Sequence, residues 1–290
     1  MNKNMQQYLD KAEVLIEALP YIQQYYKRVV VIKYGGHAME NASLKSKVME
    51  DIVLLQLVGV SVVLVHGGGP DISEVMGRMG IEPKFVDGLR VTDEETAGIA
   101  QMVLAGKVGK SLVNMIEATG GKAVGICGID GRMVLAKAKD PALGYVGEIT
   151  RINTQPITDL LERGYIPVIS SVGCDEEGRV YNINADTMAA QISGAMGAEC
   201  LISMTDVPGI LLDPDDPGSL VHVADINDAQ ELFRRGVISG GMIPKVESCV
   251  EALLCGVRKV FILDGRVPHS ILLEMLTDAG SGTMMVGEKQ

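Results

Sequence analysis

The residues best suited to chemistry follow two buried strands and stand beside glycine-rich turns. Residues 62–65 are apolar and lead directly into His66-Gly67-Gly68-Gly69, and residues 29–32 lead in the same way into Lys33-Tyr34-Gly35-Gly36. Residues 70–79, after the glycine triplet, have the pattern of a helix. Bare backbone N–H groups and the positive end of a helix attract anions. We therefore predict an anion site, and phosphate is the expected anion.

Three further charged residues stand where they could assist such a site. Asp186 opens an alanine-rich helical segment, Lys245 follows Gly240-Gly241, and Arg90 stands in a glycine-containing loop. Each also has a plain structural alternative, because Asp186 could cap its helix, Lys245 could be an exposed helix residue, and Arg90 could form an ion pair. His66 is predicted to be a packed strand-end residue rather than a general base, since no serine or cysteine nucleophile marks such a role.

Two common phosphate-binding motifs do not fit the chain. Residues 106–111 resemble the end of a P-loop, but the position of its first glycine is Leu104. That segment also lies inside a helical pattern rather than after a strand. In the dinucleotide-binding motif, Gly67 and Gly69 would need a third glycine at the position of Ile72. The predicted phosphate site is therefore neither of the two common types.

The elements that would position these residues alternate between strands and helices. A helix is predicted over residues 42–58, between the two strands that end in glycine turns, and a long helical pattern runs from residue 92 to about 117. Later strands are predicted at residues 166–171, 200–204, 259–263 and 283–286, and later helices at residues 225–235, 240–256 and 270–276. This alternation predicts an α/β fold with a mainly parallel sheet between helix layers.

Two features interrupt the alternation. The strand-like residues 123–127, 133–138 and 146–149, with Asp130-Gly131 between them, are expected to form a small β excursion with a hairpin. A seam between two lobes is predicted near residues 173–178.

The amino-terminal segment precedes the first strand. Residues 4–26 carry apolar side chains at helical spacing, and Pro20 inside this pattern should kink or break the helix. The apolar stripe could pack on its own domain or on another subunit, and the pattern alone does not decide between them.

Composition restricts the partners of the chain. Hydrophobic residues make up 47% and charged residues 22% of its 290 residues, as in an ordinary soluble globular protein. A net charge of −11 argues against nucleic acid or an anionic membrane as a partner. The five cysteines are scattered and suit a reducing cytoplasm rather than disulfides or zinc. No apolar run approaches the roughly 20 residues of a membrane span, and the amino terminus lacks the apolar core of a signal peptide.

The chain resembles the amino-acid kinase family in the wording and order of six motifs. These motifs are Lys33-Tyr34-Gly35-Gly36, Val65-His66-Gly67-Gly68-Gly69-Pro70, Gly88-Leu89-Arg90-Val91-Thr92, Tyr181-Asn182-Ile183-Asn184-Ala185-Asp186, Thr205-Asp206-Val207-Pro208-Gly209-Ile210-Leu211 and Gly240-Gly241-Met242-Ile243-Pro244-Lys245. The resemblance implies a three-layer αβα sandwich with an oligomerisation helix at residues 1–26. It also implies an amino-acid lobe at residues 27–178 and an ATP lobe at residues 179–290. His37 departs from the pattern, since an asparagine is more usual there.

The implied reaction is phosphoryl transfer from ATP, with Mg²⁺, to the side-chain carboxylate of N-acetyl-L-glutamate in arginine biosynthesis. By resemblance, Lys33 and Lys245 grip the transferring phosphate and Asp186 holds both lysines. The same resemblance assigns substrate binding to Gly68, Gly69, Arg90 and Asn182, and nucleotide binding to Gly35, Gly36, Thr205, Asp206, Gly209 and Leu211. The phosphates of ATP are expected to hold the metal, so no metal site built by the protein is predicted. The alternatives are a sister kinase for glutamate, aspartate or carbamate, a non-catalytic sensor, and an oligomeric scaffold.

Regulation by arginine is implied by two further features. The kinked amino-terminal helix and residues 269–283 resemble the arginine-inhibited members of the family, which form hexamers as trimers of dimers. The resemblance places the inhibitor near Tyr21, His269, Glu274, Gly280 and Gly282, with Glu274 as the anionic partner. A nitrogen-signalling regulatory protein is a further expected partner.

Overall fold

The computed structural model describes residues 3–35, 41–86 and 88–287, and an eight-stranded sheet runs through its centre. The strands, in their order across the sheet, are β12 (Val223–Asp225), β14 (Thr283–Val286), β13 (Lys259–Asp264), β11 (Cys200–Thr205), β1 (Val29–Tyr34), β2 (Ser61–His66), β8 (Ile166–Ser170) and β5 (Ala123–Cys127). The strands from β13 to β5 are parallel, whereas β14 runs antiparallel to β13 and β12 runs parallel to β14. The predicted mainly parallel sheet is confirmed.

Helices cover both faces of the sheet. One layer consists of α3 (Ala42–Leu57), α4 (Gly69–Arg78), α5 (Glu94–Gln101), the π-helical η2 (Met102–Val108), α6 (Gly109–Ala118) and α11 (Ser270–Leu276). The other consists of α7 (Gln155–Glu162), α8 (Ala185–Ala195), α9 (Ile226–Arg234) and α10 (Met242–Leu254). Val30 and Ile32 of β1 join the core under the first layer and Val31 joins the core under the second, because side chains alternate along a strand. The three-layer sandwich is therefore confirmed.

A second, four-stranded sheet joins β10 (Val180–Asn182), β9 (Val172–Cys174), β6 (Val134–Ala138) and β7 (Gly147–Ile152). The prediction that residues 123–127 belong to this β excursion is wrong. They form β5, the edge strand of the main sheet, which pairs with β8 from Ala123 to Cys127. Asp130-Gly131 is not the turn of the hairpin either. These residues lie in a 3₁₀ turn before β6, and the hairpin joins β6 to β7.

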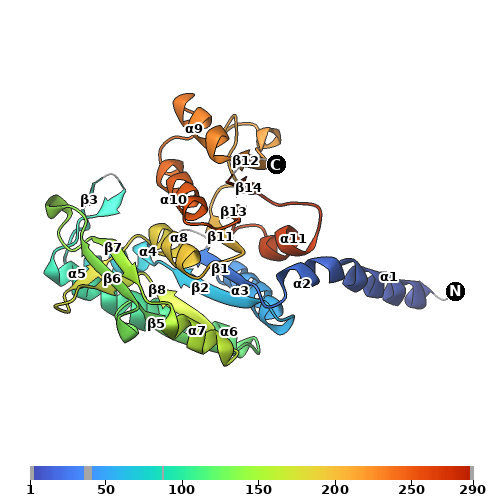
Figure 1. Ribbon diagram of the computed structural model, residues 1–290, viewed down its shortest axis with the longest axis horizontal. Helices are drawn as coiled ribbons and strands as arrows, with labels where there is room; N and C mark the ends of the chain where they lie inside the picture. The colour runs from blue at the N-terminus through green and yellow to red at the C-terminus, as the bar shows by residue number, and fades with distance from the viewer. Residues whose placement is uncertain (1–2, 36–40, 87, 288–290) are drawn as a thin grey trace.

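The amino-terminal helix is bent, as predicted. It consists of α1 (Lys3–Glu17) and α2 (Leu19–Tyr25), and Pro20 lies in the first turn of α2, where its missing N–H is tolerated. Tyr25 is buried against the body of the protein, whereas Val14, Leu15 and Ile16 of α1 are 62%, 73% and 68% exposed. Figure 1 shows α1 projecting away from the remaining elements. Within the chain itself, the apolar stripe of α1 is therefore left uncovered.

The sheet brings the chemically interesting residues to one edge. Lys33, near the carboxyl end of β1, is in register with Val65 of β2 and Ser203 of β11. The carboxyl ends of parallel strands meet at one edge of a sheet, and ligands bind there in open α/β folds. In the part of the chain that the structure describes, no helix is long and apolar enough to cross a bilayer.

Candidate active site

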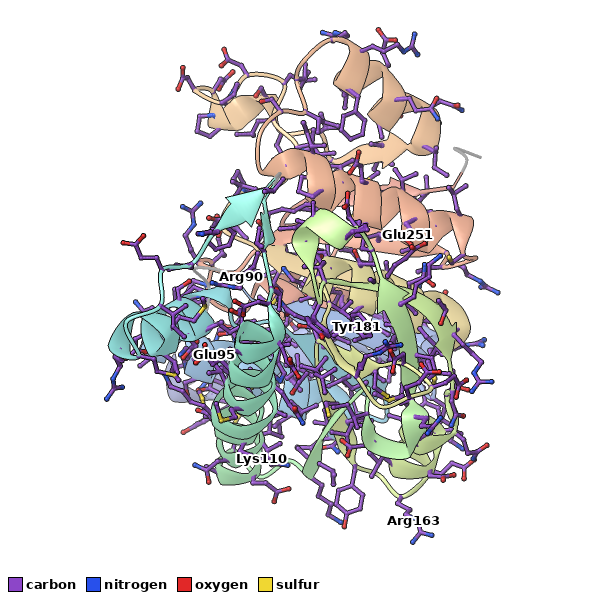
Figure 2. All side chains as sticks on the ribbon, turned by 90° about the vertical axis from the view of Figure 1, so that its left-hand side faces the viewer. Arg90, Glu95, Lys110, Arg163, Tyr181 and Glu251 are labelled. Atoms are coloured by element: carbon purple, nitrogen blue, oxygen red, sulfur yellow. The ribbon has the colours of Figure 1, made fainter. Side chains whose placement is uncertain are left out.

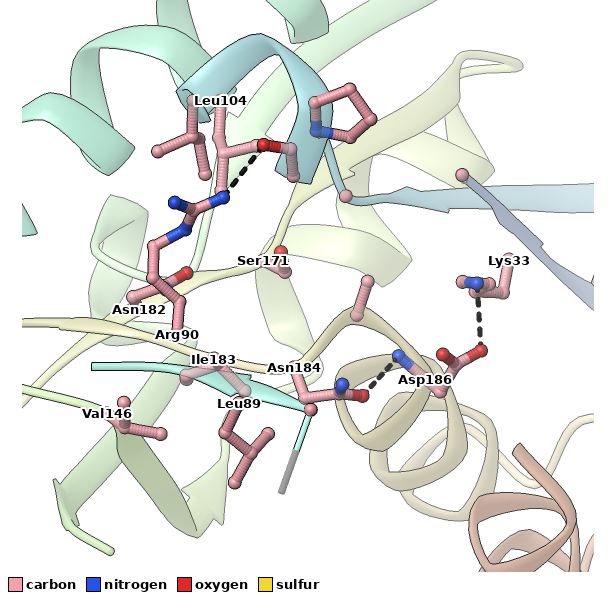
Figure 3. A pocket seen from close by; sticks show the side chains of 18 of the residues that line it. Lys33, Leu89, Arg90, Leu104, Val146, Ser171, Asn182, Ile183, Asn184 and Asp186 are labelled. Atoms are coloured by element: carbon pink, nitrogen blue, oxygen red, sulfur yellow. Dashed lines mark hydrogen bonds and ion pairs between the residues drawn. The ribbon is translucent and has the colours of Figure 1, made fainter. Parts of the chain in front are cut away.

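A cavity of about 270 Å³ opens at the carboxyl edge of the sheet (Figure 3). Predicted catalytic and substrate-binding residues from distant motifs meet in it. The lining includes Lys33, Gly35, Gly68, Gly69, Arg90, Asn182, Asp186 and Lys245. Segments more than 200 residues apart in the sequence thus contribute to one site.

Lys33 and Asp186 form the charged centre of the cavity. Lys33 Nζ lies 2.9 Å from Asp186 Oδ1, and the two side chains are only 7% and 16% exposed. Asp186 lies in the first turn of α8, whose N-cap is Asn184. The Oδ1 atom of Asn184 accepts hydrogen bonds from the N–H groups of Asp186 and Thr187, at 2.9 and 3.1 Å. This cap fixes the start of the helix and thereby the position of the carboxylate.

Lys245 reaches the same cavity from the first turns of α10. The charges of Asp186, Lys33 and Lys245 all act on Cys249, a buried thiol of α10 whose pKa is raised to about 12, mainly by burial. All three charged groups line the same cavity. Two ammonium groups repel each other, and a carboxylate beside them reduces this repulsion while leaving one positive charge in excess.

The glycine triplet forms the amino-terminal end of α4. Gly68 is the N-cap of this helix and Pro70 lies in its first turn. A Cβ atom on Gly68 would lie 2.8 Å from Leu104 Cδ2, so the turn has no room for a side chain. Gly67, Gly68 and Gly69 all line the cavity. The positive end of α4 therefore borders the cavity, which suits an anion.

Arg90 lies beside the glycine turn, where several contacts hold its side chain. It lies on β4 (Leu89–Arg90), which pairs with β3 (Phe85–Val86) in a two-stranded hairpin. Its Nη2 atom donates to the carbonyl oxygen of Gly69 and to Ser73 Oγ, both at 2.8 Å, and its guanidinium lies 4.8 Å from the ring centroid of Phe85. Burial lowers the pKa of Arg90.

Across the described residues, no carboxylate forms an ion pair with Arg90, so its charge is available for an anion. Figure 2 shows Arg90 near the end of the α5–η2–α6 segment that carries Glu95, with Lys110 toward the other end. Asn182 lies beside Arg90 in Figure 3, and its Nδ2 atom donates to Thr92 Oγ1 at 3.4 Å. A guanidinium and an amide side by side could bind a carboxylate.

The predicted nucleotide-binding residues are more dispersed. Gly35 lines the cavity, and Gly36, with the unusual His37, lies outside the described residues. Thr205 ends β11 at the same edge of the sheet, and its hydroxyl donates to Asp206 Oδ1 at 3.1 Å.

Gly209 and Leu211 follow Thr205 in the loop after β11. Gly209 has a φ of 145°, and a Cβ atom there would lie 2.5 Å from Thr283 Oγ1. Leu211 forms an isolated bridge with Leu220. The lining of the 270 Å³ cavity does not include Thr205, Asp206, Gly209 or Leu211.

A second pocket, of about 660 Å³, lies between the amino-terminal helices, α3 and α11. Tyr21 and His269 line it. Tyr21 donates a hydrogen bond to Asp278, and His269 Nδ1 lies 2.5 Å from Asp51 Oδ1. Of the other residues predicted for an arginine site, Glu274 accepts a hydrogen bond from the N–H of Ser281 at 2.6 Å.

The two remaining glycines of that predicted site lie close by in the chain. Gly280 has a φ of 60°, and a Cβ atom on Gly282 would lie 2.1 Å from the carbonyl oxygen of Ile262. Glu274, Gly280 and Gly282 do not line the pocket themselves. The structure thus brings Tyr21 and His269 together in one pocket and leaves the other three outside its lining.

Several cavity residues were not predicted as site residues. Asn184 lines the cavity and caps α8, and an asparagine two residues before Asp186 is a capping signal that the sequence contains. Leu104 reaches the cavity from the π-helical η2, which has no comparable sequence signal. Residues 106–111 do not form a P-loop, as predicted. Lys107 lies within the π-helical η2 and pairs with Asp71 at 2.9 Å.

The fold and the site define an α/β protein whose cavity is built to hold anions between two lysines, a glycine turn and an arginine. The model of the amino acid kinase family matches residues 28–264, and the chain belongs to that family. Acetylglutamate kinase of Synechococcus elongatus is 54% identical over 96% of this chain and 93% of the relative. Acetylglutamate kinase of Clostridioides difficile is 52% identical over 97% of this chain and 99% of the relative.

Among solved structures, N-acetylglutamate synthase from Neisseria gonorrhoeae is similar in fold. Its complex with coenzyme A and N-acetyl-glutamate has a TM-score of 0.84 and 28% identity, and covers 96% of this chain and 64% of the synthase. Its complex with coenzyme A and L-arginine has a TM-score of 0.80 and 26% identity, and covers 96% of this chain and 65% of the synthase. The chain thus spans about two thirds of that longer protein.

Proposed function

We propose that this protein is an ATP-dependent kinase that phosphorylates the side-chain carboxylate of N-acetyl-L-glutamate, a step of arginine biosynthesis in the cytoplasm. The main support for this proposal is the cavity in which Lys33, Asp186 and Lys245 face the glycine turn and Arg90. The names and identities of the curated relatives support this acceptor.

The acceptor needs no general base, because a carboxylate is already ionised at pH 7. What the site must supply is alignment of two anions and neutralisation of charge on the moving phosphoryl group. We assign this neutralisation to Lys33 and Lys245. Asp186 keeps the two ammonium groups together, and the N–H groups at Gly68 and Gly69 add donors without a side chain in the way.

Arg90 is assigned to the α-carboxylate of the acceptor. Its guanidinium is already oriented by Gly69 and Ser73, so little side-chain freedom is lost on binding. Asn182, beside it, is assigned a hydrogen bond to the same substrate. The apolar part of the cavity wall, with Leu89 and Val146, leaves room for the uncharged acetyl group.

ATP is assigned to the side of the site formed by residues 179–290, with Thr205, Asp206, Gly209 and Leu211, and its phosphates would approach Gly35 and Gly36. Asp186 is the one carboxylate among the described residues that line the cavity, and it is engaged by Lys33. A magnesium ion would therefore be held chiefly by the phosphates of ATP, and it would neutralise part of their charge.

The direct test is ADP formation from ATP with four acceptors offered separately: N-acetyl-L-glutamate, L-glutamate, L-aspartate and carbamate. We expect turnover with N-acetyl-L-glutamate and at least ~100-fold lower kcat/KM with unacetylated glutamate, because an ammonium group would have to be desolvated where the acetyl group fits. Comparable turnover with another acceptor would assign the protein to a sister activity.

Inhibition by arginine is a second proposal, favoured by the pocket beside α2 and by the uncovered stripe of α1. The synthase whose fold is similar has been solved with L-arginine. Glu274 would pair with the guanidinium of arginine, and Tyr21 and His269 would border the ligand. Two copies of α1 would cover each other's apolar stripes and join dimers into a hexamer, since a twofold interface is self-complementary. A nitrogen-signalling regulatory protein remains a proposed partner.

A further inference from the structure

A buried hydrogen-bond chain lies directly behind the glycine turn, and the proposed mechanism does not use it. His66 ends β2, Ser170 ends β8, and the two residues are partners in register on neighbouring parallel strands. Their exposed fractions are 0% and 1%. Ser170 Oγ lies 3.0 Å from His66 Nε2, and His66 Nδ1 lies 2.9 Å from the carbonyl oxygen of Gly67.

The partners of His66 determine where its proton resides. A carbonyl oxygen can only accept, so Nδ1 carries the hydrogen and donates to Gly67. Burial lowers the pKa of His66 to about 4, so the ring is neutral at pH 7 and has a single N–H. Nε2 is therefore an acceptor. The single hydrogen of the Ser170 hydroxyl lies within reach of both Nε2 and the carbonyl oxygen of Leu104. Because that carbonyl already accepts the N–H of Gly109, the hydroxyl is assigned as the donor to Nε2. The chain runs from Ser170 through His66 to the backbone of the glycine turn.

This chain of hydrogen bonds fixes the orientation of one peptide group. The carbonyl of Gly67 and the N–H of Gly68 belong to the same planar trans peptide and point in opposite directions. His66 is fully buried and does not line the cavity, whereas Gly67 and Gly68 do. Anchoring the carbonyl on the buried side therefore turns the N–H toward the cavity. Glycines restrict their own backbone weakly, so the orientation depends on such an external contact.

We propose that His66 and Ser170 are positioning residues, which lock the Gly67–Gly68 peptide so that its N–H faces the transferring phosphoryl group. This inference rests on the proposed kinase function. A donor that is already oriented before the reaction needs no reorganisation when charge develops on the phosphoryl oxygens. The expected contribution is therefore to kcat rather than to substrate binding.

The π-helical segment η2 contacts the same hydrogen-bonded residues from the opposite side of Ser170. The carbonyl oxygen of Leu104 lies 3.1 Å from Ser170 Oγ and accepts the N–H of Gly109, five residues on. A Cβ atom on Gly109 would lie 3.1 Å from both His66 Nε2 and Ser170 Oγ. The side chain of Leu104 in turn covers Gly68. His66 thus contacts the glycine turn at Gly67, and the side chain of Leu104 contacts it at Gly68. π-Helical turns are frequent at functional sites.

The rival account is that His66 merely fills space in the core. Two substitutions separate the accounts, because the amide nitrogen of asparagine falls near the place of Nδ1 and that of glutamine near the place of Nε2. His66→Asn can keep the donor to the carbonyl of Gly67, and His66→Gln cannot. We expect kcat of His66→Gln to fall at least about tenfold below that of His66→Asn, with KM for ATP and N-acetyl-L-glutamate within about twofold. Equal kcat values in the two variants would overturn the proposal.

Ser170→Ala decides the question if the histidine variants do not fold, since it removes only one oxygen atom from a buried strand. We expect its kcat to fall about three- to tenfold at unchanged KM. Ser193→Ala is the matched control, because Ser193 is buried in α8 and, among the described residues, its hydroxyl donates to the carbonyl oxygen of Ala189 alone. If the parent is active and Ser170→Ala matches Ser193→Ala in kcat, the inference is wrong. A parent without kinase activity would instead refute the proposed function.

Discussion

Lys33 Nζ and Asp186 Oδ1 lie 2.9 Å apart, although β1 and α8 are separated by 150 residues of chain. The pair is largely buried, and Asp186 is oriented by the cap at Asn184 rather than by the lysine alone. A buried ion pair is weak evidence for stability, because desolvation offsets much of the Coulomb attraction. Its location in the cavity, with Lys245 nearby, indicates a functional reason for it.

Replacing Lys245 by alanine tests the positive charge that Asp186 leaves unneutralised in the cavity. We expect kcat to fall at least ~100-fold with little change in folding stability, since a charge directed at the transition state contributes about 3 kcal/mol. Steady-state kinetics and thermal unfolding measure the two effects. Lys122→Ala is the matched control, because Lys122 is exposed at the opposite edge of the sheet. Near-parent kcat in Lys245→Ala would remove the lysine from the mechanism.

Arg90→Lys separates substrate binding from structure. Lysine keeps the charge but loses the planar fork, and it cannot contact Gly69, Ser73 and a substrate carboxylate together. We expect KM for N-acetyl-L-glutamate to rise by about tenfold or more, and KM for ATP to change by less than about threefold. Equal rises in both constants would mean that Arg90 supports the fold of the site rather than the acceptor.

His66 predicts a pH dependence of stability with a definite sign. Its pKa is lowered to about 4 in the folded protein and is about 6.5 in the unfolded chain. The unfolded state therefore binds a proton that the folded state does not, between these two values. The resulting stabilisation is present above pH 6.5 and is lost as the pH falls toward 4, by up to about 3 kcal/mol.

Urea unfolding of the parent and of His66→Gln between pH 7 and pH 4.5 measures this contribution. The free energy of unfolding should fall more steeply in the parent. Asp51 acts in the opposite direction, because burial raises the pKa of that carboxyl to about 6, but it is common to both proteins and cancels in the difference. Identical pH slopes would contradict the assignment of a neutral, buried His66.

Deleting residues 1–17 tests the proposed role of α1. The deletion removes the exposed Val14, Leu15 and Ile16 and leaves the buried Tyr25 of α2 in place. If the full-length protein forms the proposed arginine-inhibited hexamer, we expect the shortened protein to be an active dimer that arginine inhibits at least ~10-fold less potently, because the proposed ring contact and part of the pocket wall are lost. Analytical ultracentrifugation gives the oligomeric size. Full-length and shortened proteins of the same oligomeric size would refute this role.

The sequence was most informative where backbone chemistry leaves a local signal. The glycine triplet after an apolar run marked the turn at Gly67–Gly69, and Pro20 marked the bend between α1 and α2. It was less informative where tertiary contacts decide. Residues 123–127 have the same strand pattern whether they pair with β8 or with β6, so their place at the edge of the main sheet could not be read locally.

The π-helical turn shows a second limit. Residues 92–117 have one continuous helical pattern, and the five-residue bond from Gly109 to Leu104 leaves that pattern almost unchanged. Leu104 therefore gave no sign that it would cover Gly68. Local sequence pattern marked Lys33, Arg90, Asp186 and Lys245 as candidates, each with a structural alternative, and the resemblance to a family assigned their roles. The structure then places all four around one cavity.

The central claim is that a carboxylate of N-acetyl-L-glutamate receives the phosphoryl group of ATP. The product would be an acyl phosphate, which reacts with hydroxylamine to give a hydroxamate. The most direct measurement is therefore ATP-dependent formation of this hydroxamate by the purified full-length protein, with L-glutamate as the comparison acceptor. The account predicts hydroxamate in amounts equal to the ADP formed with N-acetyl-L-glutamate, and at least ~100-fold less with L-glutamate. ADP released without hydroxamate, or equal hydroxamate from both acceptors, would contradict it.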